Sequence, residues 1–280
     1  MRRPFPQAAM LRRTATALAL SICGFGASVQ AADAASLVLP PPQPSLSVAQ
    51  IVARNVAARG GLAAWRKIRT MAWVGHIESA HAPMPSMMFT LEQERPNKTR
   101  FEINALGQTT IRVFDGNHGW KLRAAPNGGP DLQSYSPEEL KFAEAAPGLD
   151  GPLIDYHAKG SVITLGGIDR VYGRRAYRLD VALRSGENDH VWVDARTFLE
   201  LRYDRTSFSQ AAMPVTVSMY YHDYKTIEGL RIPSVIETGV GSGKEPDRIV
   251  IERILLNPHL DARTFAMPDA PLPVQRSVRR

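Results

Sequence analysis

The sequence has almost no cysteine. Cys23 is the only one among 280 residues, and it lies in an N-terminal segment that we expect to be removed. Without Cys23 the chain can form no disulfide, no thiolate nucleophile and no zinc site with cysteine ligands. Lipidation of Cys23 stays open as an alternative, although lipid-bearing cysteines normally follow a small residue and Ile22 is large.

Motifs for catalysis and metal binding are also missing. No Gly-x-Ser-x-Gly turn presents a serine nucleophile. The glycine-rich run 239–245 is not a phosphate-binding loop, because no glycine stands five positions before Gly243 and Glu245 replaces the Ser or Thr that binds magnesium. The histidines are too scattered to pair as ligands on a helix; they are His76, His81, His118, His157, His190, His222 and His259. We therefore assign no catalytic residue, no metal ligand and no cofactor, and we expect that the protein is not an enzyme.

The body of the chain has no excess of one charge. The formal net charge is +7 and the pI is about 9.7. The arginines that cause this excess lie near the two ends; they are Arg2, Arg3, Arg12, Arg13, Arg276, Arg279 and Arg280. The remaining chain carries as many acidic as basic residues. Because nucleic-acid-binding proteins need a basic surface, we expect no nucleic-acid partner.

The N-terminus has the pattern of a secretory signal. Arg12 and Arg13 precede the apolar run 15–27, and small residues before Ala32 offer a cleavage site. We therefore expect a signal peptide over 1–31, export to the periplasm, and no transmembrane segment in the mature chain. A proline-rich linker follows over 32–46, and a basic, disordered tail is expected over 271–280.

Hydrophobic periodicity predicts a mainly β protein of the α+β class. Val48, Ile51, Val52 and Val56 follow a helical period that Gly60-Gly61 ends, and a short second helix is expected from Leu62 to about Lys67. From Met71 the period changes to two, and about eleven strands follow at spacings typical of an antiparallel sheet. Ser136-Pro137-Glu138-Glu139 is a strong helix start, which predicts a helical insert over roughly 135–158. The expected architecture is a single domain over 47–270, an incomplete antiparallel β-barrel around the N-terminal helix.

Such a sheet has one large apolar face with little to cover it. A sheet that curls around one helix encloses a cavity suited to apolar ligands, and methionine among the aromatic residues suits varied acyl chains. The predicted lipid-binding residues are Trp73, Met87, Phe89, Leu91, Phe101, Ile103, Ile111, Val113, Trp120, Leu122, Leu179, Val181, Val217 and Met219. The alternative is that these side chains fill a closed core.

Short segments along the chain resemble a known family. They are Gly60-Gly61 with Trp65 and Ile68-Arg69; Phe114 to Trp120; Val191 to Asp194 with Thr197 to Glu200; Gly229 to Pro233; and Asn257-Pro258 with Leu260-Asp261 and Phe265. In this order they resemble the LolA/LolB-like outer-membrane lipoprotein-sorting proteins over about 48–268. The resemblance implies an incomplete β-barrel closed by helices, and binding of lipid or lipoprotein acyl chains that are passed between membranes. The insert over 130–158 has no counterpart in that family, and the family's functional arginine matches no position here.

Three hypotheses follow for the function. The first is a periplasmic carrier of lipid or of lipoprotein acyl chains. The second is a non-catalytic sensor or interaction module of the envelope, which uses the same half-barrel to contact a membrane protein or other envelope partner. The third is an enzyme acting on an envelope polymer or lipid, which needs His76, His118 or His222 beside Asp115 or Asp223 in the cavity. The sequence leaves the cargo and the oligomeric state open.

Overall fold

The computed structural model describes residues 46–82, 84–125, 129–208, 214–240 and 245–268. The predicted signal peptide 1–31 and tail 271–280 lie outside these residues, as does the linker 32–46 except for Leu46. The described residues all belong to one unit of the chain, Ser45–Arg280, which is distinct from the unit Met1–Pro44. Within this described part, no helix combines the length and apolar character that a bilayer span requires.

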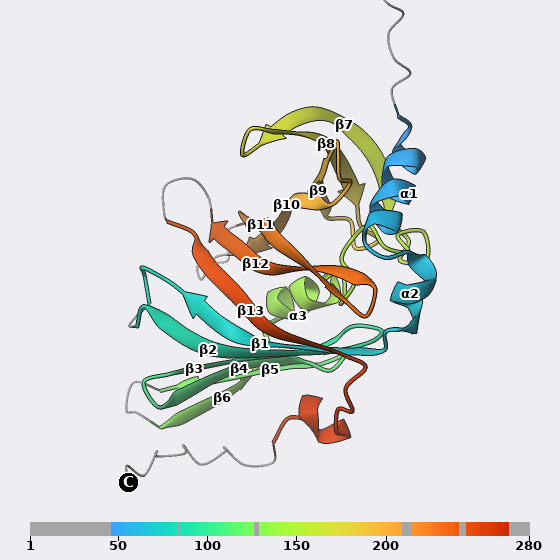
Figure 1. Cartoon of the computed structure of the whole chain (residues 1–280). Coiled ribbons are helices and arrows are strands. Elements are labelled where there is room, and N and C mark those ends of the chain that lie inside the picture. Colours follow the sequence, from blue (N-terminus) through green and yellow to red (C-terminus); the bar gives the residue numbers. More distant parts are fainter. Residues whose placement is uncertain (1–45, 83, 126–128, 209–213, 241–244, 269–280) are drawn as a thin grey trace, which may run out of the picture. The chain divides into compact units, whose positions relative to one another are not determined.

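The strands of the described part form one antiparallel sheet (Figure 1). The sheet has 13 strands in the order β6-β5-β4-β3-β2-β1-β13-β12-β11-β10-β9-β8-β7. Their bounds are β1 Thr70–Glu78, β2 Ser86–Glu94, β3 Lys98–Ala105, β4 Gln108–Phe114, β5 Gly119–Ala124, β6 Pro130–Ser134, β7 Val162–Val171, β8 Arg174–Ala182, β9 Asn188–Asp194, β10 Glu200–Phe208, β11 Pro214–Ile227, β12 Leu230–Val240 and β13 Asp247–Leu256. The two ends of the sheet, β6 and β7, do not pair with each other, so the barrel is incomplete, and the predicted fold class is confirmed.

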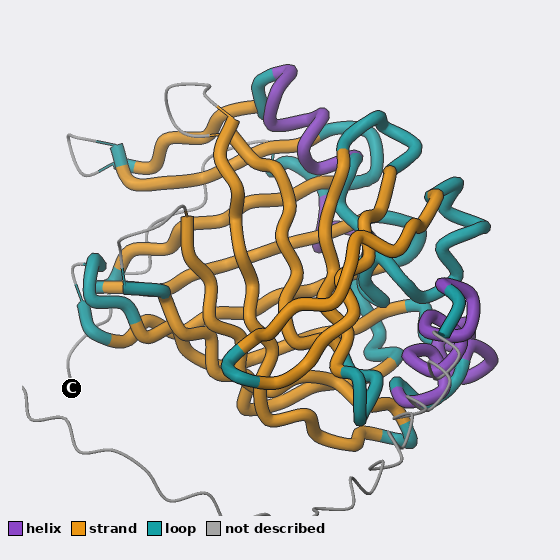
Figure 2. The backbone as a smooth tube through the Cα atoms, turned by 90° about the horizontal axis from the view of Figure 1, so that it is seen from above, coloured by secondary structure: helices purple, strands orange, loops and turns teal. Residues whose placement is uncertain are grey.

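The sheet consists of two meanders joined by the last strand. Strands β1 to β6 pair in chain order, as do β7 to β12, and β13 lies between β1 and β12. Figure 2 shows the strands crossing over one another where the sheet curls back on itself. The β1–β13 pairing carries a bulge between Val74 and Gly75, where a Cβ on Gly75 would lie 1.9 Å from the carbonyl oxygen of Val250. Glycine is therefore required in this β1–β13 pairing, which we call the seam between the two meanders.

Helix α1, Val48–Ala58, covers one end of the inner face of the sheet. Its N-terminus carries a capping box, because the Ser47 hydroxyl accepts a hydrogen bond from the backbone N–H of Gln50 and the Gln50 side chain accepts one from the Ser47 backbone. Ile51 and Val52 pack with Leu179, Val181, Val191 and Val193 on β8 and β9. The inner face is the side of the sheet against which α1 packs, and the outer face is the opposite side.

The central insert begins with the predicted helix, but this helix is shorter than predicted: it ends at Glu144, and residues 149–160 form turns. Helix α3 spans Pro137–Glu144, with Ser136 as N-cap, Glu139 completing the capping box, and Pro137 in its first turn. Local capping chemistry alone determines this start, which is why the sequence predicts it. The sequence does not predict β6, because the Gly-Gly-Pro turn and the polar residues Asp131 and Gln133 hide its alternation.

The apolar side chains change face between β3 and β4. Phe101 on the inner face of β3 pairs with Arg112 on β4, whereas Ile111 pairs with Glu102. Ile111, Val113, Trp120 and Leu122 therefore lie on the outer face, where they form a cluster with Phe265 of the 3-10 helix Ala262–Phe265. The indole N–H of Trp120 donates to the carbonyl oxygen of Phe265 at 3.2 Å. Placing these four predicted lipid-binding residues on the inner face is wrong. Alternation shows that a strand has an apolar face, but not which layer covers it.

Candidate ligand-binding cavity

The inner face of the sheet holds a cavity of about 430 Å³. This volume lies within the range of about 300–1,000 Å³ that small-molecule sites occupy. One wall comes from β1 to β4, and the opposite wall comes from β9 to β12. The short helix α2, Leu62–Lys67, contributes Trp65, and α3 with the segment that follows it contributes residues from Glu139 to Pro152. In Figure 1, α3 lies against the inner side of the curled sheet.

Part of the cavity wall consists of residues predicted from the sequence. Trp73, Leu91, Phe101 and Met219 line the cavity, and Leu149, Val191 and Ile232 add to the apolar surface. Register brings the first three together, because Trp73 pairs with Leu91 and Leu91 pairs with Phe101. Aromatic, aliphatic and thioether side chains thus share one continuous surface.

The other predicted inner-face residues lie around the cavity. Met87, Phe89 and Ile103 pack beside the wall in a cluster with Ile236 and Ile251. The Phe89 and Phe101 rings lie 5.8 Å apart. Leu179 and Val181 are fully buried beneath α1, and Val217 lies on the inner face of β11, opposite Arg205. These residues support the wall or close the end of the sheet.

A buried ion pair lies in the wall, and no sequence motif points to it. The Arg59 Nη1 lies 2.8 Å from Glu200 Oε1, and both side chains are less than a tenth exposed. The Tyr224 hydroxyl donates to Glu200 Oε2 at 3.1 Å, and the Arg59 guanidinium rests 4.5 Å from the centre of the Trp65 ring. Burial opposes the charge on Arg59, but the interactions with Glu200, Tyr224 and Tyr221 together outweigh it and raise the pKa of Arg59. The only signal in the sequence is that Glu200 stands between Leu199 and Leu201.

A second charged cluster ties α3 to the sheet. Glu139 accepts hydrogen bonds from Arg112 of β4 at 2.9 Å and from Lys121 of β5 at 2.8 Å, as well as from the Ser136 backbone N–H. Burial alone raises the pKa of a carboxylate, yet these donors lower the pKa of Glu139 to about 2. Because the apolar side chains of β4 and β5 face outward, the inner face of these strands is free to hold α3 by its charges.

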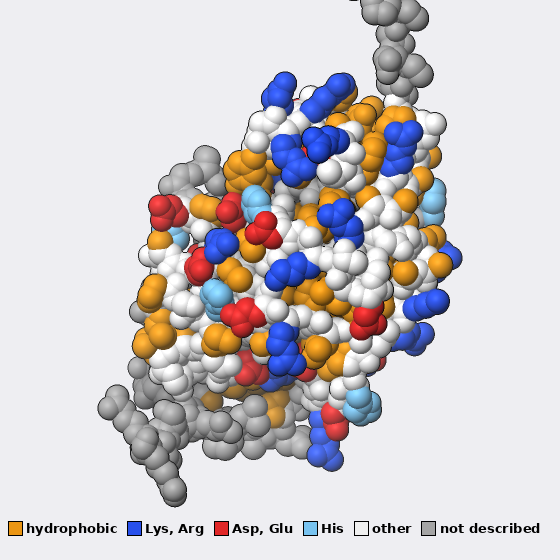
Figure 3. Space-filling view, viewed as in Figure 1, with side chains coloured by type: hydrophobic (Ala, Val, Ile, Leu, Met, Phe, Trp, Pro, Cys, Tyr) orange, Lys and Arg blue, Asp and Glu red, His pale blue; other side chains and the backbone are white. Residues whose placement is uncertain are grey.

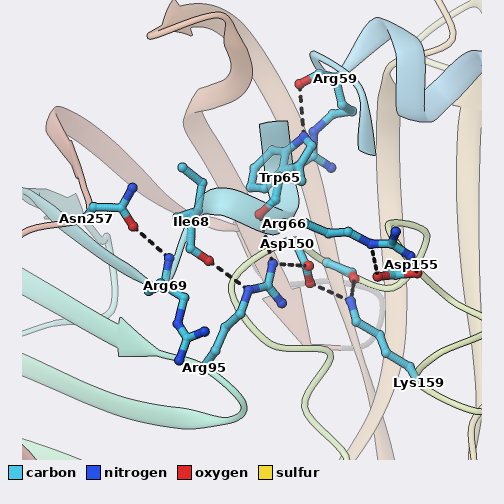
Figure 4. A network of polar contacts seen from close by, with 11 residues as sticks. Arg59, Trp65, Arg66, Ile68, Arg69, Arg95, Asp150, Asp155, Lys159 and Asn257 are labelled. Carbon is cyan, nitrogen blue, oxygen red and sulfur yellow. Dashed lines mark hydrogen bonds and ion pairs between the residues drawn. The ribbon is translucent and has the colours of Figure 1, made fainter. Parts of the chain in front are cut away.

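The segment after α3 is fixed by another polar network (Figure 4). Asp150, which is 1% exposed, accepts hydrogen bonds from Arg95 and from Lys159. Arg95 also donates to the carbonyl oxygens of Ile68 and Trp65, so the network joins the end of α2, the β2–β3 turn and the insert. Arg66 forms a bidentate pair with Asp155 on the same segment. The rim of the cavity is therefore held by buried and bidentate charge pairs.

The histidines proposed for an enzyme do not meet in the cavity. His76 pairs with Glu252 and Glu78, and His222 lies near Glu237. His118 beside Asp115 is 86% exposed. None of these three residues lines the cavity. Among the described residues, no group of three or more histidine, cysteine or acidic side chains is placed to hold a metal ion.

Comparisons with known proteins give similarity in structure only. Neither a family model nor a curated protein matches the chain. A putative outer membrane lipoprotein-sorting protein domain from Vibrio parahaemolyticus is 8% identical, covers 77% of this chain and 94% of its own, and superposes with a TM-score of 0.48. A LolA superfamily protein from Nitrosomonas europaea is 12% identical over 80% of this chain and 99% of its own, with a TM-score of 0.49.

A further similar structure is a DUF1329 family protein from Desulfovibrio piger. It is 13% identical over 79% of this chain and 98% of its own, with a TM-score of 0.49. At these identities and TM-scores the similarity assigns no function, and the geometry of the cavity has to carry that assignment. The structure has the open antiparallel sheet with packed helices that the sequence resemblance to LolA-like proteins implies.

Proposed function

We propose that this protein binds an acyl chain of a lipid or lipoprotein in the cavity of its inner face. One observation carries the proposal: the cavity of about 430 Å³ is bordered by Trp73, Leu91, Phe101 and Met219, on walls from both meanders. Burial of each methylene stabilises a bound chain by about 0.8 kcal/mol. A chain of ordinary length therefore gains on the order of 10 kcal/mol before entropy losses.

Such binding requires no reactive group, which agrees with the sequence. Hydrophobic contact between an acyl chain and an apolar wall is non-directional. The aromatic residues and the flexible side chain of Met219 can therefore adapt to different acyl chains. A finer proposal is that the protein carries this ligand between membranes in the periplasm. The N-terminal signal pattern and the family resemblance of the sequence support that proposal.

The test is lipid analysis of protein purified from the envelope of its own host, together with uptake of a fluorescent fatty acid. We expect a co-purifying lipid and saturable uptake of about one chain per protein. Phe101→Ala should weaken uptake, while Arg123→Gln on the exposed part of β5 serves as a control that leaves it unchanged. Protein that contains no lipid and takes up no fatty acid contradicts the proposal.

The interaction-module hypothesis is favoured by a different observation. The edge strand β7 exposes Val162, Leu165 and Ile168, and the adjoining turn exposes Tyr172. An edge strand offers unpaired backbone groups as well as side chains to another protein. Figure 3 shows Lys and Arg side chains gathered at the end of this view where β7 and β8 lie. The test is a pull-down of envelope proteins. A stoichiometric partner that stays bound after delipidation but is lost from the Ile168→Glu variant favours this function over that of a carrier.

A further inference from the structure

Arg205 is a cationic side chain in the cavity wall. It lies on the inner face of β10, two residues after Tyr203 and opposite Val217. Its guanidinium carbon lies 3.7 Å from the centre of the Phe142 ring on α3. Among the described residues, no hydrogen bond or ion pair involves this guanidinium. Phe142 therefore supports one face of the group and leaves the edges, where the N–H donors lie, unused.

The charges that line the cavity do not balance. The ionised lining side chains are Arg59, Arg112, Arg205, Glu139 and Glu200. Arg59 pairs with Glu200, and Arg112 pairs with Glu139. Within the described lining this leaves a single positive charge without a partner, and that charge is on Arg205.

The nearest acidic candidate is already engaged. Asp189, which is 3% exposed, accepts a hydrogen bond from the Tyr203 hydroxyl and forms no ion pair with Arg205. Burial raises the pKa of Asp189 and the positive charge of Arg205 opposes that rise, so the two groups attract each other without forming a direct ion pair. An unpaired cation in an apolar wall is costly unless a ligand compensates it, and an arginine cannot escape the cost by losing its proton.

We infer that the ligand of this cavity is an amphiphile with an anionic head, a carboxylate or a phosphate, and that Arg205 binds this head. The inference rests on the proposed function, since the chain of the amphiphile is the apolar ligand that lies against Trp73, Leu91 and Phe101. The planar guanidinium fork matches both head groups, each of which can accept two parallel hydrogen bonds from it.

The test compares ligands of equal chain length that differ in the head. Lauric acid, dodecyl phosphate and dodecanol are titrated against the full chain at pH 7 by displacement of a neutral fluorescent probe from the cavity. We expect the two anionic ligands to bind about tenfold more tightly than the alcohol. Acetate and inorganic phosphate, which carry the head without the chain, should not displace the probe. If they displace it as well as the amphiphiles do, the site is a free-anion site and the inference is overturned.

Variants of Arg205 test whether the preference for anionic ligands depends on this side chain. Arg205→Gln should remove the preference for the anionic ligands while leaving dodecanol affinity unchanged, and Arg205→Lys should restore part of it. Arg175→Gln makes the same charge change at an exposed position outside the cavity and should keep the full preference. Thermal unfolding and dodecanol binding show that each variant folds.

The outcomes separate this inference from the proposed function. Arg205 binds no anionic head if dodecanol and lauric acid bind equally to the wild type, or if Arg205→Gln keeps the preference for anionic ligands. Either result leaves the proposed binding of an acyl chain in the cavity unaffected. If none of the twelve-carbon ligands displaces the probe, both the proposed function and this inference fail.

Discussion

Glu200 is an acidic side chain enclosed in the cavity wall with Arg59 as its ionic partner. Replacing it with glutamine keeps the shape but leaves the Arg59 charge buried and unpaired. We therefore expect Glu200→Gln to lower the free energy of unfolding by about 3–5 kcal/mol, measured by urea denaturation. Glu94→Gln, which removes a carboxylate from the more exposed Lys98 pair, should cost less than about 1 kcal/mol. Equal losses at the two sites contradict the role assigned to the Arg59–Glu200 pair.

Gly75 is the residue on which the seam between the two meanders depends. A methyl group at this position meets the backbone carbonyl of Val250, which cannot move without displacing β13. Gly75→Ala should therefore cost about 1–3 kcal/mol in unfolding free energy. The matched control is Gly239→Ala on β12, where the nearest atom outside its chain neighbours lies 3.8 Å from the added carbon. Thermal unfolding of both variants checks the difference, and a neutral Gly75→Ala contradicts it.

At the scale of whole elements, strands β3 and β4 show that the sequence predicts where strands lie but not which face of the sheet their side chains occupy. The alternation around Phe101, Ile111 and Val113 correctly predicts strands, because period two is a local property of the backbone. It cannot tell that Ile111 and Val113 face outward, since this depends on a C-terminal segment that returns to cover them. The polar part of the cavity was beyond prediction for the same reason. Arg59 and Glu200 lie 141 positions apart and meet only in the fold.

A pair of leucine variants tests the change of face. Leu91 lines the cavity, whereas Leu122 lies in the outer cluster with Phe265. Leu91→Ala should weaken binding of an acyl probe severalfold. Leu122→Ala should lower stability by about 2–5 kcal/mol and leave the affinity of the folded protein unchanged. Probe titration and denaturation of both variants decide the question, and a loss of affinity in Leu122→Ala places that residue in the site.

Helix α3 is held to the sheet by a carboxylate, and its anchoring should depend on pH. The pKa of Glu139 is about 2, below its ordinary value of 4.5. The stabilisation is therefore complete above about pH 4.5 and is lost as the pH falls toward 2. We expect the protection of the α3 amides from hydrogen exchange, relative to the intrinsic exchange rate at each pH, to fall over this range in the wild type.

The Glu139→Gln variant should exchange faster already at pH 7 and respond less to acid. Glu144→Gln changes the same charge on the same helix without touching β4 or β5, so it should behave as the wild type does. A wild-type α3 whose exchange is insensitive to acid between pH 5 and 2.5, after correction for the intrinsic rate, contradicts the anchoring role of Glu139.

For the molecule as a whole, the order of strands implies an order of folding. Each meander is built from neighbouring hairpins, but β1 must wait for β13, with which it pairs through contacts such as Met71 with Leu256. Closing so long a loop costs more entropy than forming a hairpin and comes late for that reason. Pulsed hydrogen exchange during refolding should show amides of the β3–β4 and β8–β9 hairpins protected before those that bond β1 to β13. Protection of the β1–β13 pairing first contradicts this order.

The pairing of β1 with β13 also bears on the proposed ligand, because it joins the two walls of the cavity. Trp73, Leu91 and Phe101 belong to one meander, while Val191, Tyr203 and Met219 belong to the other, and β13 is the strand through which the sheet connects them. Because sheet twist is a local property of paired strands, the separation of these two groups of residues depends on the twist at β13. Under the proposed function, that twist determines which widths of acyl chain the same lining residues can accommodate.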